Sequence, residues 1–352
     1  MRVGLECLHM TTVHTPRGHA ARYTLACYDG MRDDHARTGA YREAITAAAQ
    51  GKVIIDLGTG ALALLAIFAA EAGAKHVYAI EVQPVAAAAA RRTINEAGLS
   101  DRITVIEGFS TDPHVVLPEK ADLLVHELIG EIAGEEGVVA AIADARKRHL
   151  APTASTPFSI PSRTTTLLAP SEYPNAAYCA DRLATTLEAP GGGQALKLPG
   201  LPRTDLLAAP QVFEDLRFEE GAPAPSQAVE LNFVAERAGW LRGLSLHVEL
   251  HCRIDGAAAP PDVSSAWSGS HWRNLFLLLG DGMALARGDL VHVRATAELG
   301  GPQPRYTFRT RVCAAPSAAQ GAGGWVDLGG TIEYPEASLN VNDACDLMME
   351  QD

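Results

Sequence analysis

Two kinds of hydrophobic pattern divide the sequence near residue 152. In the first part, short runs of apolar residues alternate with longer stretches of helical character. The runs cover residues 53–57, 76–82, 103–107 and 121–128, and the stretches cover residues 40–50, 61–72 and 84–96. Continuous apolar runs are typical of parallel strands that are buried on both faces. This part therefore predicts a doubly wound α/β domain with a mostly parallel sheet.

The second part follows Pro152, Pro157 and Pro161, and its apolar residues alternate with polar ones. This alternation is clearest in residues 244–252, 290–296 and 306–312. A period of two indicates antiparallel strands with one buried face, so we expect a β-rich second domain. Residues 175–225 are rich in Pro, Gly and Ala and fit neither pattern, which leaves a projecting arm or a long loop.

Composition narrows the class of protein. The chain has 352 residues, a net charge of -13 and six cysteines without the spacing of a zinc site, so we expect no metal. The acidic balance argues against nucleic acid as the main partner. Neither a secretory signal nor a run of apolar residues long enough to span a membrane is apparent, so we expect a cytoplasmic protein with no membrane partner. The abundance of Ala, Gly, Pro and Arg suggests a bacterial genome.

A glycine turn follows the first predicted strand, in the order Asp56-Leu-Gly58-Thr-Gly60. Such a turn lets backbone N–H groups approach a ligand at the start of a helix. Glu81 ends the next predicted strand, where a carboxylate can accept hydrogen bonds from both hydroxyls of a ribose. These features predict a nucleoside site, which an NAD-dependent oxidoreductase would share. Leu62 stands where a dinucleotide site needs a third glycine, and this disfavours a pyrophosphate ligand.

The fourth predicted strand ends in an acidic segment. Gly130 and Gly134 interrupt it, which indicates a loop at the carboxyl edge of the sheet, where α/β folds place their sites. Carboxylates that face one cavity need a cation, and a guanidinium group matches them through its planar set of donors. A solvated acidic loop is the alternative interpretation. The acidic residues of this segment are Glu127, Glu131, Glu135 and Glu136.

Taken together, five motifs in this order resemble those of the protein arginine methyltransferases. They are Met31-Arg-Asp-Asp34-His-Ala-Arg37-Thr38, the glycine turn at 56–60, the segment 72–82 that ends in Glu81-Val, the pair Glu127 and Glu136, and Ser270-His271-Trp272. The resemblance implies a Rossmann-like domain that binds S-adenosylmethionine over residues 1–152, with residues 1–50 as a helical segment that covers the cofactor. It also implies a β-barrel-like substrate domain over residues 153–352, with residues 175–215 as a dimerisation arm of a homodimer.

The same resemblance assigns roles to individual residues. Glu127 and Glu136 would hold the guanidinium of an arginine substrate and favour attack by one nitrogen. Asp34 and His271 would form a pair at the domain boundary that completes the catalytic group, and Trp272 would wall the substrate. Glu131 and Glu135 are expected to be solvated. The residues expected to bind the cofactor are Met31, Arg37, Asp56, Gly58, Gly60, Glu81, Glu107 and Ser110.

Some positions depart from the family pattern. His126 stands where the family usually has Ser, Leu62 replaces a glycine, and the stretch with Tyr23 and Tyr28 lacks the full N-terminal motif. The shortened motif favours free arginine, or a small metabolite that contains arginine in a biosynthetic pathway, over the alternative of a protein or peptide substrate. The number of methyl groups transferred stays open. A catalytically silent binding protein on the same fold is the remaining alternative, although it would not need the Glu127 and Glu136 pair.

Overall fold

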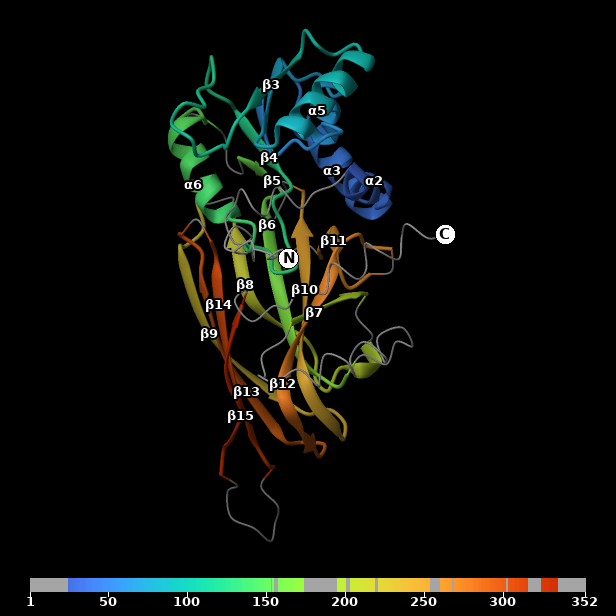
Figure 1. The fold of residues 1–352 in the computed structure, drawn as a ribbon, viewed down its shortest axis with the longest axis vertical. Coiled ribbons are helices and arrows are strands. Elements are labelled where there is room, and N and C mark those ends of the chain that lie inside the picture. Colours follow the sequence, from blue (N-terminus) through green and yellow to red (C-terminus); the bar gives the residue numbers. More distant parts are fainter. Residues whose placement is uncertain are drawn as a thin grey trace, which may run out of the picture.

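The computed structural model describes most of the chain. The described residues are 25–152, 154, 158–173, 195–200, 203–218, 221–253, 260–267, 269–301, 303–315 and 324–334. Figure 1 shows an elongated molecule with the α/β domain at one end and long antiparallel strands extending from it. Among the described residues, no helix is long and apolar enough to cross a membrane.

The α/β domain is built on a parallel sheet with the strand order β3-β2-β1-β4-β5. Its strands are β1 (Val53–Leu57), β2 (His76–Glu81), β3 (Ile103–Glu107), β4 (Leu123–His126) and β5 (Ser159–Ile160). Every residue of β1 and β4 is buried, as the continuous apolar runs predict. The order reverses between β1 and β4, and the carboxyl ends of these two strands therefore flank the crevice where such sheets bind ligands.

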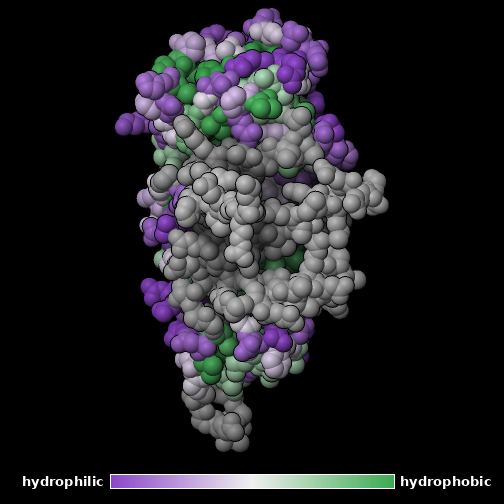
Figure 2. Space-filling model, in the orientation of Figure 1, coloured by the Kyte–Doolittle hydropathy of each residue, from purple (hydrophilic) through white to green (hydrophobic). Residues whose placement is uncertain are grey.

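Helices cover both faces of this sheet. They are α2 (Leu25–Asp33), α3 (His35–Ala48), α4 (Leu64–Glu71), α5 (Pro84–Glu96) and α6 (Val138–Arg148). Figure 1 shows α6 on the opposite side of the sheet from α3. Hydrophilic side chains cover much of this end of the molecule on the face in Figure 2, with hydrophobic ones between them. The core beneath is apolar and includes Tyr41, Ile54, Leu124 and Ile142.

The second domain consists of two antiparallel sheets. One has the order β7-β12-β10-β6-β8, with β11 paired to β10, and the other has the order β15-β14-β13-β9. The strands are β6 (Arg163–Ser171), β7 (Ala195–Pro199), β8 (Gln211–Arg217), β9 (Ser226–Val234), β10 (Gly239–His251), β11 (Val263–Ser264), β12 (Arg273–Leu285), β13 (Leu290–Glu298), β14 (Arg305–Cys313) and β15 (Val326–Tyr334). Contacts of β8 with β9 and of β12 with β15 join the two sheets, which gives a barrel-like domain. The predicted fold class is confirmed.

Two observations bear on the expected boundaries. Strand β5 lies beyond residue 152 and still pairs with β4, so the parallel sheet takes its last strand from the expected second domain. Strand β7 pairs with β12, and β8 pairs with β6, so residues 195–199 and 211–215 of the expected arm belong to the barrel. A turn of 3-10 helix, Arg203–Asp205, lies between them. Residues 174–194, which hold most of the expected arm, lie outside the described residues.

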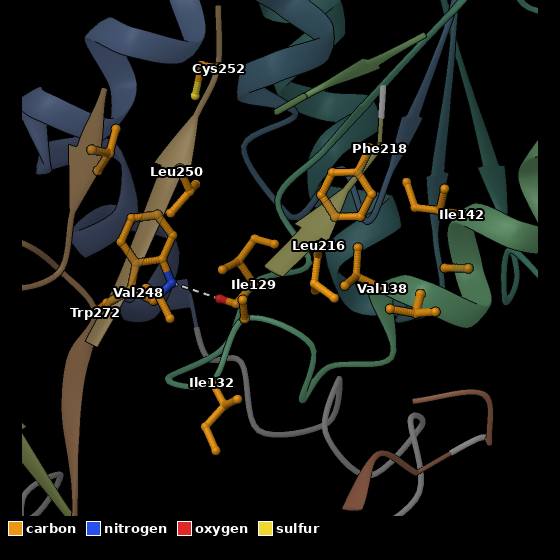
Figure 3. Packing of buried hydrophobic residues seen from close by; sticks show 14 of the residues in the cluster. Ile129, Ile132, Val138, Ile142, Leu216, Phe218, Val248, Leu250, Cys252 and Trp272 are labelled. Atoms are coloured by element: carbon orange, nitrogen blue, oxygen red, sulfur yellow. Dashed lines mark hydrogen bonds between the residues drawn. The ribbon is translucent and has the colours of Figure 1, made fainter. Parts of the chain in front are cut away.

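An apolar interface joins the two domains. Figure 3 shows side chains of the segment after β4 lying beside side chains from the barrel strands and α6. Ile129 and Ile132 are buried there, at 2% and 0% exposure, and belong to the same core cluster as Leu216 and Trp272. The indole N–H of Trp272 donates a hydrogen bond of 2.7 Å to the carbonyl oxygen of Ile129. The barrel therefore contacts the loop that carries the candidate catalytic residues.

Candidate active site

A cavity of about 380 Å³ lies at the carboxyl edge of the parallel sheet. Its volume falls within the range of small-molecule sites. Four segments at the carboxyl ends of β1, β2, β3 and β4 line it, together with α2, the start of α6 and a turn of the barrel. The lining residues include Tyr28, Met31, Arg32, Arg37, Gly58, Thr59, Gly60, Leu62, Glu81, Phe109, Ser110, Glu127, Glu136, Ala140, Gly300 and Gly301. The cavity thus contains most of the predicted site.

The glycine turn forms one wall because its backbone takes a conformation that side chains disfavour. Gly58 and Gly60 have φ angles of 72° and 66°. A Cβ atom on Gly60 would lie 2.6 Å from the ring of Tyr28, so the absence of a side chain lets α2 close over the turn. The turn lines the cavity, so a flat ligand can lie against its backbone.

Glu81 lies beside the turn and is held in place by the backbone. One carboxylate oxygen accepts a hydrogen bond of 2.9 Å from the N–H of Gly60, and the other accepts one of 2.8 Å from the N–H of Gln83. Burial raises the pKa of Glu81, and these backbone hydrogen bonds oppose the rise. A fixed carboxylate with lone pairs left over is suited to accept hydroxyl groups of a ligand.

Asp56 lies behind the turn and is buried, at 1% exposure. Its carboxylate accepts a hydrogen bond of 2.6 Å from the hydroxyl of Thr59, which lines the cavity. Burial raises the pKa of Asp56 to about 7, although the hydrogen bond from Thr59 opposes the rise. Asp56 is not among the described lining residues, so the structure places it as a support for the turn.

A buried ion pair joins α3 to the end of β4. Nη2 of Arg37 lies 2.8 Å from Oε2 of Glu127, and both side chains are less than a tenth exposed. Nη1 of Arg37 also donates to the carbonyl oxygen of Met31 at 3.2 Å. Among the described groups, none pairs with the buried Nε of Arg37. Arg37 therefore fixes one candidate catalytic carboxylate and also lines the cavity.

Asp34 connects the same helix to the barrel. It caps the start of α3 by accepting a hydrogen bond of 3.0 Å from the N–H of Arg37. Its other oxygen, Oδ2, lies 3.0 Å from the ring Nδ1 of His271 and 2.9 Å from the backbone nitrogen of the same residue. Burial raises the pKa of Asp34, but the hydrogen bonds from His271 and Arg37 outweigh it and lower the pKa to about 2. The sequence predicted this pair, and the structure contains it.

Not every predicted residue reaches the cavity. His271 and Trp272 are not among the described lining residues. The centroids of the Trp272 and His271 rings are 4.0 Å apart, and the guanidinium carbon of Arg37 lies 6.0 Å from the centroid of the Trp272 ring. Glu107 is also outside the lining, and its half-exposed carboxylate faces Arg91 at 3.4 Å. The structure therefore gives Glu107 no contact with the cavity, although residues 108–111, which follow it directly, line the cavity.

The expectation that Glu131 and Glu135 are solvated is wrong. Glu131 forms an ion pair of 2.8 Å with Lys197 of β7, and its side chain is 15% exposed. Glu135 is buried at 7% exposure and accepts a hydrogen bond of 3.0 Å from the backbone N–H of Glu131. The loop folds back on itself and against the barrel, so these two carboxylates stabilise its shape. Glu127 and Glu136, by contrast, both line the cavity.

Comparisons with known proteins agree with this architecture. A family model described as ribosomal protein L11 methyltransferase matches residues 35–156. A probable histone-arginine methyltransferase CARM1 of Oryza sativa subsp. indica is 40% identical over 125 residues, which are 35% of this chain and 23% of that protein. A probable protein arginine N-methyltransferase 6 of Arabidopsis thaliana is 35% identical over 151 residues, which are 42% of this chain and 33% of that protein. The chain thus spans a third or less of the length of these relatives.

Solved structures extend the similarity to the barrel. The crystal structure of Arabidopsis thaliana protein arginine methyltransferase 10 has a TM-score of 0.70 at 19% identity and covers 88% of this chain and 98% of that one. The Trypanosoma brucei PRMT1 enzyme–prozyme heterotetrameric complex with AdoHcy has a TM-score of 0.68 at 20% identity, over 89% of this chain and 99% of that one. The resemblance to the protein arginine methyltransferases is confirmed. At these identities the match to the barrel shows its fold alone.

Three groups of lining residues escaped sequence reasoning. Tyr28 was noted only as part of an incomplete arginine methyltransferase motif, although its ring packs on Gly60. Phe109 follows β3 and lines the cavity, as do Gly300 and Gly301 in the turn after β13. A phenylalanine in a turn and a pair of glycines in a hairpin are too common to indicate a site. Gly300 and Gly301 reach the cavity only through the contact between the domains.

His126, which departs from the arginine methyltransferase pattern, points away from the cavity into the core. It is fully buried, and its ring packs edge-on against Phe218 at 5.1 Å. Among the described groups, neither ring nitrogen has a hydrogen-bond partner. Burial lowers the pKa of His126 to about 3, so the ring is neutral at physiological pH. This departure therefore lies in the packing at the domain interface and outside the described lining of the cavity.

This burial predicts a pH dependence of stability. The pKa of His126 in the folded state lies below its ordinary value. The stability that the neutral, buried ring contributes is therefore fully present above pH 6.5 and is lost as the pH falls from about 6.5 toward about 3. Between pH 7.5 and pH 5, His126 should lower the free energy of unfolding by about 2 kcal/mol. Urea denaturation of the wild type and of His126→Phe at both pH values measures this difference. An equal fall in both proteins would contradict the assignment.

Proposed function

We propose that the protein is an S-adenosylmethionine-dependent methyltransferase that acts on a guanidino nitrogen of arginine. The observation that carries this proposal is that Glu127 and Glu136 line the same cavity as the glycine turn and Glu81. A cofactor against the turn and a guanidinium between the two glutamates would then meet in one enclosed space. A dinucleotide-dependent oxidoreductase would have no use for this pair of carboxylates.

The residues present fit the proposed cofactor. The turn at Gly58 and Gly60 lines the cavity, so its backbone would lie against a bound nucleoside. Glu81 would accept the ribose hydroxyls, and the guanidinium of Arg37, which lines the cavity, would meet the carboxylate of the methionyl part. When bound, S-adenosylmethionine supplies a methyl group on a positively charged sulfur. The carboxylates of Glu81, Glu127 and Glu136 around the cavity suit a cationic ligand better than a pyrophosphate.

Catalysis would rest on positioning and electrostatics. Glu127 is already fixed by Arg37, so its carboxylate direction is set before substrate enters. Glu127 and Glu136 together would compensate the guanidinium charge that loses its water, and would localise that charge away from one nitrogen. This nitrogen would keep more lone-pair character, which suits it to accept the methyl group that the bound cofactor would supply. The Asp34–His271 pair lies behind Arg37 and would hold the barrel in register with the site.

The names of the relatives favour a protein or peptide as the substrate that carries the arginine. The shortened N-terminal motif favoured free arginine, but residues 1–24 lie outside the described residues. We therefore propose arginine in a protein or peptide as the first candidate substrate, ahead of free arginine. Labelled S-adenosylmethionine should transfer its methyl group to arginine-rich peptides, as judged by mass analysis of the products. Transfer to free arginine alone would reverse the order, and transfer to neither would refute the proposed function.

Glu81 should be needed for cofactor binding. Replacing it with Ala removes hydrogen bonds to a charged group, so binding of S-adenosylmethionine should weaken by about 2 kcal/mol, or roughly 30-fold. Isothermal titration calorimetry measures this loss. Glu107→Ala is the matched control, because Glu107 also ends a strand of the sheet but lies outside the cavity. Equal affinities of wild type and Glu81→Ala would show that the ribose site has been misplaced.

Glu136 should be needed for methyl transfer and not for cofactor binding. The change Glu136→Gln keeps the shape of the side chain and removes one charge, and turnover should fall by at least about 10²-fold. The dissociation constant of S-adenosylmethionine should stay within a factor of a few. Glu43→Gln, on the exposed side of α3, controls for the change in net charge. Glu136 gives a cleaner test than Glu127, whose replacement also leaves Arg37 buried without its counter-ion.

A further inference from the structure

A fully buried carboxyl group in the barrel contacts the loop that carries the candidate catalytic pair. Glu214 of β8 has 0% exposure. Its Oε2 accepts hydrogen bonds from the hydroxyl of Thr166 at 2.9 Å and from the backbone N–H of Gly134 at 3.2 Å. Its Oε1 accepts a hydrogen bond from the hydroxyl of Tyr306 at 3.2 Å. All three neighbours are donors, and a carboxylate, which only accepts, matches them.

Thr166 of β6 extends this contact to the neighbouring loop residue. Its hydroxyl oxygen accepts a hydrogen bond of 2.9 Å from the backbone N–H of Ala133, while the hydroxyl hydrogen is donated to Glu214. Two consecutive backbone amides of the loop, at residues 133 and 134, are therefore held by two side chains of the barrel. Glu136 follows two residues later and lines the cavity.

The packing at Gly134 leaves little freedom in this arrangement. A Cβ atom at this position would lie 2.7 Å from Oε1 of Glu214 and 2.9 Å from the hydroxyl oxygen of Tyr306. The loop backbone thus sits directly on the carboxyl group. Ile132, just before these residues, is also fully buried, and Figure 3 shows it on the loop below Ile129. The loop is consequently fixed by polar and apolar contacts at the same place.

Stability alone does not require a carboxyl group here. Burial raises the pKa of Glu214 to about 7, and the hydrogen bonds from Thr166, Gly134 and Tyr306 oppose the rise. An apolar side chain of similar volume is often as stable as a buried charged group, or more so. Unlike an apolar residue, a glutamate at this position accepts a hydrogen bond from the loop backbone.

We propose that Glu214 and Thr166 are positioning residues, which hold the backbone of the loop at Ala133 and Gly134 and so set where Glu136 meets a substrate guanidinium. This inference rests on the proposed function, because it assigns a role in methyl transfer. Displacement of a catalytic group by about 1 Å is enough to lower a rate by roughly 10²-fold. Glu214 and Thr166, which do not line the cavity, would thereby act on the reaction without touching the substrate.

Thr166→Val tests the inference, because it keeps the size of the side chain and removes both hydrogen bonds. Thr164→Val is the matched control: Thr164 lies on the same strand and face, is fully buried, and its hydroxyl has no partner among the described groups. With an arginine-rich peptide, the kcat of Thr166→Val should fall at least about tenfold. Its dissociation constant for S-adenosylmethionine should stay within about twofold of the wild-type value, since Glu81 and the glycine turn are elsewhere. Thr166→Ser should restore the rate.

Hydrogen exchange of the peptide that contains residues 129–137 gives a readout independent of activity. Exchange should become faster in Thr166→Val and stay unchanged in Thr164→Val and Thr166→Ser. Wild-type exchange and wild-type kcat in Thr166→Val would overturn the proposal while leaving the proposed function intact. A parallel loss of kcat and of thermal stability in both valine variants would overturn it too, as a general effect on the barrel. If exchange were faster in Thr166→Val but the wild type transferred no methyl group, the contact between Thr166 and the loop would stand. Its role in methyl transfer would then be overturned together with the proposed function.

Discussion

The buried ion pair between Arg37 and Glu127 is the interaction on which the cavity depends. Removing either partner would leave a charge in a place that water does not reach, and such a loss is far more destabilising than the loss of an exposed pair. The pair joins α3 to the end of β4. Because Asp34 caps α3 one turn earlier and also contacts His271, a single helix positions the cofactor side, the acidic loop and the barrel.

The acidic loop has two kinds of glutamate, and their surroundings separate them. Glu131 forms an ion pair with Lys197, and Glu135 accepts a hydrogen bond from the loop backbone. Glu127 and Glu136 face the cavity. Four carboxylates so close in sequence would repel one another in a low-dielectric site. The fold limits this repulsion by placing two of them in the cavity and holding the other two against Lys197 and the loop backbone. The substrate site then needs only two of them.

The sequence predicted the parts of the site that depend on local pattern. The glycine turn, Glu81 and the β1, β2 and β3 strands follow from apolar runs and turn residues, and the Asp34–His271 contact follows from the family resemblance. The solvation of Glu131 was predicted wrongly because its partner Lys197 is 66 residues away in the chain. The role of Gly300 and Gly301 was missed for the same reason. Contacts between domains leave no periodic trace in either segment, so they become visible only in the folded molecule.

The separation of Asp34 and His271 by 237 residues bears on how the protein is made. The parallel sheet is complete once β5 has been synthesised, and by then the chain also contains the glycine turn and both glutamates of the cavity. The barrel strands that hold the acidic loop in place, and the histidine that reaches Asp34, emerge from the ribosome later. Domains fold largely in the order in which they are synthesised. The nascent chain therefore acquires a nucleoside-shaped crevice early in translation, and a site with its carboxylates in register only near the end.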